Sequence, residues 1–177
     1  MRQHLVLTIS GHDRPGIVDH VAKLLLTYDG NIEASRMARL GGEFAMLMLV
    51  SVPQKNFDAL REGVRQLRDE DFKVTTRPTE RGYAARYAGW VPFEVVARGA
   101  DHEGIIHQLT HYLAGQNVNV ETMDTEVVKA PMSGTPLLRL TAIVLVPPDL
   151  SHHDLRRALE DLGDDLGVDT DIKPYVQ

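Results

Sequence analysis

The chain has 177 residues, which suits one ordinary domain or two small ones. Hydrophobic residues make up 43% and charged residues 25%, as in globular proteins without long disordered segments. The formal net charge of −6 argues against direct nucleic-acid binding, because phosphate contacts need a basic surface. The absence of cysteine excludes disulfides, thiolate metal sites and thiol nucleophiles.

The sequence has no apolar run near the roughly 20 residues of a membrane span. The N-terminal residues also lack the apolar core of a signal peptide. We therefore expect a soluble, cytoplasmic protein that contacts no membrane.

The first half of the chain predicts the element order βαββαβ. Alternating apolar residues over 5–9 predict a strand that stops at Ser10 and Gly11, and Pro15 suits the first turn of the next helix. The apolar face of that helix would consist of Ile17, Val18, Val21, Leu24, Leu25 and Tyr28. Asp29 and Gly30 end the helix and lead into a strand that begins at Asn31.

The pattern continues with a hairpin, a helix and a strand. Gly41 and Gly42 predict the hairpin turn, followed by a strand over 44–52. A second amphipathic helix would use Phe57, Leu60, Val64 and Leu67, before a last strand over 72–76.

The second half predicts the same order. Strands are expected at 93–97, 118–128, 137–146 and 168–172. The first helix of this half would use Ile105, Ile106, Leu109, Tyr112 and Leu113, and the second Leu155, Leu159 and Leu162. The predicted domains are residues 1–79 and 90–177, joined by a polar linker over 80–89.

The two halves also align as an internal repeat. A shift of 88 positions needs no gap between residues 11–33 and 99–121. It pairs Gly11 with Gly99, Asp13 with Asp101, Gly16 with Gly104, Asn31 with Asn119 and Glu33 with Glu121. The second copy then has about six extra residues, expected in its central hairpin. The predicted fold class is α+β: two modules, each an antiparallel sheet with helices on one face.

Two strands do not alternate as a sheet covered on one face should. Residues 44–50 and 142–146 are almost uniformly apolar. We expect these strands to be buried on both sides, against the sister module or another chain, although a mildly apolar outer face gives the same pattern.

The loop over residues 11–16 joins the first strand to the first helix. Unpaired N–H groups and the helix dipole favour an anion there, so a carboxylate is the simplest ligand. Gly16 would let a ligand approach the backbone, Arg14 adds a cation, and Asp13 either caps the helix or receives an ammonium group. Asn31 offers a hydrogen-bond donor and an acceptor. The candidate ligand-binding residues, which together would suit an amino acid, are Gly11, His12, Asp13, Arg14, Pro15, Gly16 and Asn31.

The same loop also fits a plain tight turn and helix start without a ligand, with Asp13 as the cap. In the second copy the loop is Asp101, His102, Glu103 and Gly104, without the proline and the arginine. We expect this second site to be weaker, to have a different specificity, or only to support the fold.

The sequence gives little support for a metal site or a catalytic centre. His107 and His111 lie one helical turn apart, but Gln108 stands where a metalloprotease motif has its acid, and a third ligand is not evident. His152 and His153 are expected to be solvated at a helix start. We predict no metal, no cofactor and no catalytic residue.

Three segments resemble the ACT-domain family. They are DRPGIV at 13–18, GNIEASRM at 30–37 and GGEFAMLMLVS at 41–51. The chain as a whole is similar to ACT proteins with two such domains that regulate transcription of the glycine cleavage system. The resemblance implies a ferredoxin-like fold and an amino-acid effector, with glycine the natural suggestion. It also implies repression through a DNA-binding partner protein.

In ACT domains the effector commonly lies at a module or subunit interface, between the first loop and the second strand. This implies a site at residues 11–16 with Asn31 and Ile32, and a weaker one at residues 101–104 with Asn119 and Val120. We expect a homodimer that binds a small-molecule effector and a DNA-binding regulator.

Two rival functions remain open. A ligand-free protein-interaction module ranks second. An acylphosphatase-like enzyme ranks third, because Arg14 and Asn31 match only the residue types of its phosphate-binding arginine and its water-holding asparagine. An RNA-binding module is disfavoured, because the first strand lacks aromatic residues and the third has only Phe44.

Overall fold

The computed structural model describes residues 1–79 and 86–176 of the chain. It divides into two compact units, Met1–Arg86 and Tyr87–Gln177. Of the predicted linker over 80–89, residues 80–85 lie outside the described residues. Tyr87 and Trp90, at its far end, pack edge to face with ring centroids 5.0 Å apart.

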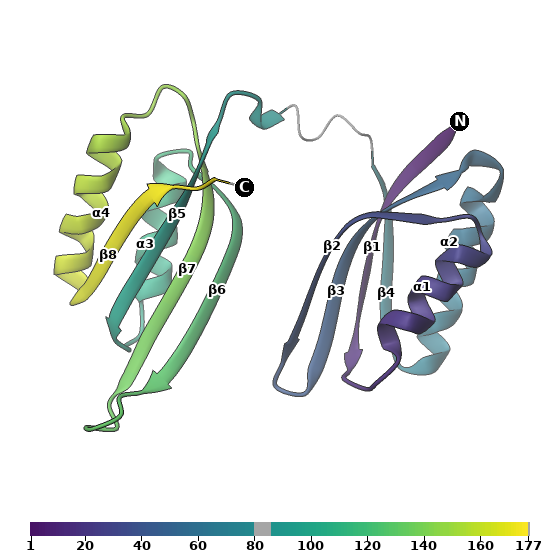
Figure 1. The fold of residues 1–177 in the computed structure, drawn as a ribbon, viewed down its shortest axis with the longest axis horizontal. Coiled ribbons are helices and arrows are strands. Elements are labelled where there is room, and N and C mark those ends of the chain that lie inside the picture. Colours follow the sequence, from purple (N-terminus) through teal and green to yellow (C-terminus); the bar gives the residue numbers. More distant parts are fainter. Residues whose placement is uncertain (80–85, 177) are drawn as a thin grey trace. The chain divides into compact units, whose positions relative to one another are not determined.

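The first unit follows the predicted βαββαβ order. Its elements are β1 (Arg2–His12), α1 (Ile17–Thr27), β2 (Asn31–Leu40), β3 (Glu43–Pro53), α2 (Phe57–Arg65) and β4 (Lys73–Thr79), with short 3-10 helices at Gln54–Asn56 and Gln66–Glu70. The four strands form an antiparallel sheet in the order β2-β3-β1-β4. Both helices lie on one face of this sheet (Figure 1).

The second unit repeats this arrangement. Its elements are β5 (Val91–Ala100), α3 (Ile105–Gly115), β6 (Asn119–Lys129), β7 (Pro136–Val146), α4 (His152–Leu166) and β8 (Val168–Pro174). The sheet order is β6-β7-β5-β8, again antiparallel, with α3 and α4 on one face (Figure 1). The predicted α+β class, with two ferredoxin-like modules, is confirmed.

Each unit has its own core between sheet and helices. In the first unit, Leu5, Leu7 and Ile9 are fully buried and pack with Val21 and Leu25 of α1. In the second unit the equivalent core includes Val95, Ile105, Leu109, Leu140 and Leu159. This burial is the main stabilising contribution in each unit.

Within the described part of the chain, no helix lies on the other face of either sheet (Figure 1). Along β3, buried Met46 and Met48 alternate with Leu47, which is 48% exposed. The exposure of the β3 side chains therefore alternates although their sequence is uniformly apolar. Burial of the outer side of β3 by a partner stays a prediction.

Two local features differ from the predicted boundaries, and a third agrees with the repeat. β1 continues to His12, one residue past the predicted stop at Ser10 and Gly11, because its last residues pair with β3 at Phe44 and Glu43. Pro15 is not in the first helical turn, because α1 begins at Ile17 after the Gly16 N-cap. The hairpin between β6 and β7 contains a longer loop than the Gly41–Gly42 turn, as the repeat predicts.

The edge strands β2 and β6 each contain a bulge, and the two bulges lie at the same position of the repeat. The β2–β3 register shifts between Ile32 and Ala34, and the β6–β7 register shifts between Val120 and Thr122. The additional residues are Glu33 and Glu121, which the repeat aligns. A bulge redirects a side chain and is a retained feature rather than a defect.

Candidate functional site

The N-terminus of α1 is open at Gly16. This glycine is the N-cap, with φ of 91°, and among the described residues no side chain caps the helix there. A Cβ atom at Gly16 would contact nothing within 4 Å. The backbone conformation therefore requires glycine, and the open space leaves the helix start accessible to an anion.

Asp13 does not cap α1, so the prediction that it might is wrong. Its carboxylate accepts a hydrogen bond from Arg39 at 3.3 Å, and its backbone N–H donates to Gly42 O at 2.9 Å. The aspartate instead fastens the loop to the β2–β3 hairpin, which its position in the sequence does not reveal.

Gly11 is required by packing rather than by a ligand. A Cβ atom there would lie 2.7 Å from Cδ1 of Phe72 and 3.1 Å from Asp71 O. The guanidinium group of Arg14 lies over the ring of the same Phe72, with Cζ 5.0 Å from the ring centroid. Glycine and arginine thus contact the same ring.

A small polar cavity of about 210 Å³ opens beside the end of β1. Its lining is Ser10, Gly11, His12, Glu43, Asp71 and Lys73. Nδ1 of His12 lies 2.8 Å from Glu43 Oε1, and both side chains are exposed. This cavity extends the candidate site beyond the residues chosen from the sequence.

Asn31 and Ile32 lie at the other end of the same module. Asn31 pairs with Ser51, which pairs with His4, whereas Gly11 is seven residues further along β1. At about 3.3 Å per residue, the two halves of the predicted site are roughly 23 Å apart. The structure does not bring them together within one module.

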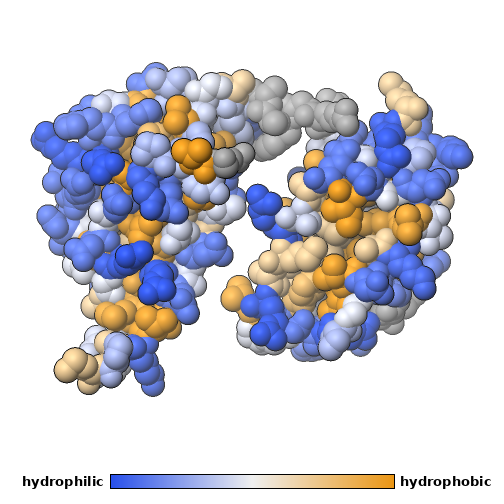
Figure 2. All heavy atoms as spheres, in the orientation of Figure 1, coloured by the Kyte–Doolittle hydropathy of each residue, from blue (hydrophilic) through white to orange (hydrophobic). Residues whose placement is uncertain are grey.

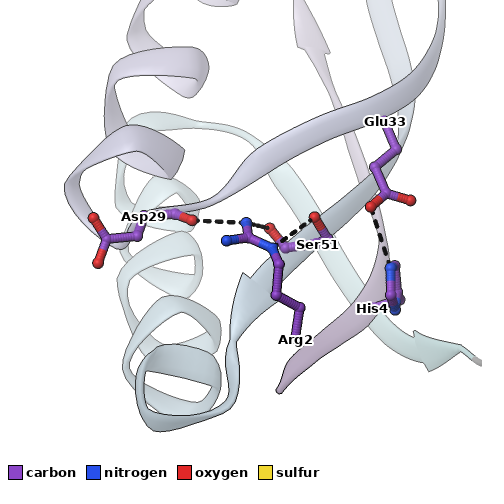
Figure 3. A network of polar contacts seen from close by, with 5 residues as sticks. All are labelled: Arg2, His4, Asp29, Glu33 and Ser51. Carbon is purple, nitrogen blue, oxygen red and sulfur yellow. Dashed lines mark hydrogen bonds and ion pairs between the residues drawn. The ribbon is translucent and has the colours of Figure 1, made fainter.

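Sequence reasoning missed a polar network at this Asn31 end (Figure 3). Arg2 donates to Ser51 Oγ at 3.1 Å, to Ser51 O at 2.7 Å and to Asp29 O at 2.9 Å. Nε2 of His4 lies 3.2 Å from Glu33 Oε1, with side-chain exposures of 10% and 25%. Among the residues whose burial is described, Ser51 is the one buried polar residue. The alignment of Glu33 with Glu121 was the one signal that pointed here.

The second module keeps the backbone of the loop but not its chemistry. Gly104 is again the N-cap, with φ of 99°, and the Asp101 N–H donates to Pro136 O as Asp13 does to Gly42. His102 Nε2 contacts Leu166 O at 2.8 Å and Nδ1 contacts Glu103 O at 3.0 Å, and these bonds raise its pKa. Asn119 and Val120 lie at the far end of the module, paired with Leu145 and Val144.

The remaining candidates do not form a centre. The rings of His107 and His111 are 5.7 Å apart, and within residues 1–79 and 86–176 there is no group of three metal-ligating side chains. The ring of His152 packs on Phe93 with centroids 4.5 Å apart. Arg14 and Asn31 lie at opposite ends of the module, so they do not make the arginine–asparagine cradle of an acylphosphatase-like site. No helix of the described part of the chain is long and apolar enough to span a membrane.

Comparison with known proteins agrees with this fold. Residues 3–77 match the family model of the ACT domain, so the first module is an ACT domain, as the sequence motifs predicted. The second module shares its repeat sequence and topology.

Similarity to individual proteins covers the whole chain. It is 27% identical over 175 residues to the glycine cleavage system transcriptional repressor of Escherichia coli K12, covering 97% of this chain and 90% of that protein. The structure of an unknown protein from Galdieria sulphuraria matches 99% of this chain and 100% of that one, at 32% identity and a TM-score of 0.84. A putative glycine cleavage system transcriptional repressor shares the fold over 100% and 99% of the two chains, at 22% identity and a TM-score of 0.73.

Proposed function

We propose that this protein is a non-enzymatic regulator that binds an amino acid between two copies of the chain. The observation that carries the proposal is the open, uncapped N-terminus of α1 at Gly16. Its N–H groups and dipole suit the carboxylate of an amino acid. Arg14 lies in the same loop and adds positive charge next to that carboxylate.

The separation of the two half-sites explains why a second copy is needed. The loop and Asn31 lie at opposite ends of α1 and β2. A two-fold axis between the α1–β2 edges of two copies would place the loop of one beside Asn31 of the other. This edge also exposes apolar side chains that such pairing would cover: Val18, Leu26, Ile32 and Met37.

The Asn31 end supplies what the ammonium group of an amino acid requires. Asn31 offers an amide oxygen, and Glu33, two residues on, offers a carboxylate that His4 already orients. Carboxylate recognition by one copy and ammonium recognition by the other together select an amino acid over a simple anion.

The similarity to a glycine cleavage repressor makes glycine the first effector to test. The net charge of −6 favours regulation through a DNA-binding partner protein rather than through DNA. The rival reading, an interaction module without a ligand, predicts that no amino acid stabilises the protein.

The test is a thermal-shift and calorimetric screen of the full chain against all amino acids, glycine first. A ligand that binds only the native state raises the melting temperature. The variant Gly16→Asp fills the helix start with a competing carboxylate and should abolish binding. Its matched control is Gly104→Asp, which has the same positive φ and therefore similar backbone strain.

A mixing experiment tests the two-copy site directly. Gly16→Asp and Asn31→Ala should each lose binding, with Asn119→Ala as the matched control for the second. In an equimolar mixture, half of the pairs are mixed, and each mixed pair has one intact site, so about a quarter of the wild-type stoichiometry returns. A mixture that binds nothing, or a flat screen with folded protein, contradicts the proposal.

A further inference from the structure

The helix-free faces of both sheets present apolar side chains at their centres. In the first unit the pairing register places Val6, Leu47 and Leu49 together there, around a hollow of about 150 Å³. In the second unit Val96, Ile143 and Leu145 occupy the same face. Figure 2 shows apolar side chains at the visible surface of each unit. Leu47 is 48% exposed and the other five side chains are partly exposed, so apolar groups lie next to one another on each helix-free face, as they do on interaction surfaces.

The net charges of these two faces are opposite in sign, although each face carries residues of both signs. We name the faces first outer face and second outer face. The first outer face carries Arg2, Arg36, Lys73 and Arg77 against Glu33 and Glu43. The second outer face carries Glu94, Asp124, Glu126, Asp169 and Asp171 against Arg98, Arg139 and Lys173. Contact between two copies of the same face would therefore oppose like charges, whereas contact between the two different faces pairs opposite ones.

From this complementarity we infer that the first outer face of one copy packs on the second outer face of another copy. Strands about 4.8 Å apart and about eight paired residues long give each face roughly 500 Å². One such contact is smaller than the roughly 800 Å² per partner of stable complexes. Two copies related by a two-fold axis form the contact twice, which doubles the area and closes the assembly.

This contact adjoins the proposed effector site and shares Glu33 with it, but the charge exchange below changes none of the residues placed in the effector site. It is centred on the sheet faces, whereas the effector site is centred on the α1–β2 edge with Gly16 and Asn31. Failure of one proposal therefore leaves the other standing: association is measured without amino acid, and effector binding is measured by calorimetry.

The test is a reciprocal charge exchange on exposed residues of the full chain. One variant combines Arg36→Glu with Arg77→Glu, and the other combines Asp124→Lys with Asp169→Lys; all four side chains are exposed. Light scattering and analytical ultracentrifugation give the molar mass of each. Each double variant alone should have half the wild-type mass. An equimolar mixture should regain the wild-type mass, because both contacts of a mixed pair are again between opposite charges.

The control variant is Lys55→Glu with Glu160→Lys, two exposed residues of the 3-10 helix before α2 and of α4. It should keep the wild-type mass, and circular dichroism should show all variants folded. A monomeric wild type, a double variant that keeps the wild-type mass, or a mixture that does not regain it would overturn the inference.

Discussion

The glycines of the two loops separate into those that close packing requires and those that a positive φ at a helix start requires. Gly11 and Gly99 belong to the fold, since a Cβ atom at either would lie under 3.0 Å from atoms of the last strand or the turn before it. Gly16 and Gly104 set a positive φ at a helix start and leave space beside it. A glycine motif read from the sequence mixes these two roles.

Gly11→Ala should destabilise the first unit, because its Cβ would overlap the Phe72 ring. Overpacking of this kind typically costs about 1–3 kcal/mol. Urea unfolding of the variant measures the loss. The control Gly115→Ala has no atom within 4 Å of the new Cβ and lies at the end of α3, where alanine should be neutral or gain up to about 1 kcal/mol. Equal stabilities of the two variants would contradict the packing argument.

His102 should make the stability of the second unit depend on pH. Its ring nitrogens both lie against backbone carbonyls, first that of Leu166 and then that of Glu103, so the doubly protonated ring is favoured and the pKa is raised from 6.5. The stabilising contribution is fully present below 6.5 and is lost as pH rises through the raised folded-state pKa.

The measurement is the urea midpoint of wild type and His102→Gln at about pH 5.5 and about pH 8. The wild type should lose more stability between these values than the variant does. NMR titration of the histidine ring gives the pKa directly, and a value at or below 6.5 would refute the assignment.

At the scale of elements, the Arg2 side chain joins the start of β1 to β3 and to the turn between α1 and β2. In the second unit the repeat places Trp90, Asn117 and Leu145 where the first has Arg2, Asp29 and Ser51. The polar fastening is therefore particular to the first unit, where the proposed Asn31 half-site needs a fixed backbone.

A double-mutant cycle with Arg2→Met and Ser51→Ala should show a coupling energy of about 0.5–3 kcal/mol in unfolding free energy. Ser133→Ala, whose hydroxyl contacts Thr135 instead, provides the uncoupled comparison with Arg2→Met. Additive effects for the Arg2–Ser51 pair would mean that the arginine is held by its other contacts alone.

The order of elements follows from the sequence because each relies on local signals. Leu5, Leu7 and Ile9 alternate, α1 has a clear apolar face, and Gly41–Gly42 marks a turn. The site was less predictable, since its contacts join distant residues. Asp13 meets Arg39 instead of capping α1, and His4 meets Glu33 across 29 positions. Neither pair has a recognisable spacing.

At the scale of the molecule, the acidic surface should prevent the protein from binding DNA alone. With a net charge of −6, electrophoretic mobility shift at about 0.15 M salt should show no complex without a partner protein. Addition of a candidate DNA-binding regulator should then change the regulator's own shift. A salt-sensitive complex formed by this protein alone would contradict regulation through a partner.

The positive φ at Gly16 and Gly104 has a consequence for how such loops diversify. Since this glycine alone forms the turn into the helix, none of the three side chains before it caps the helix. The same backbone turn is preceded by Asp13-Arg14-Pro15 in one copy and by Asp101-His102-Glu103 in the other. The aspartate is common to both copies and its N–H makes the same kind of bond in each, so the two residues between it and the glycine can differ in chemistry while the helix start stays the same.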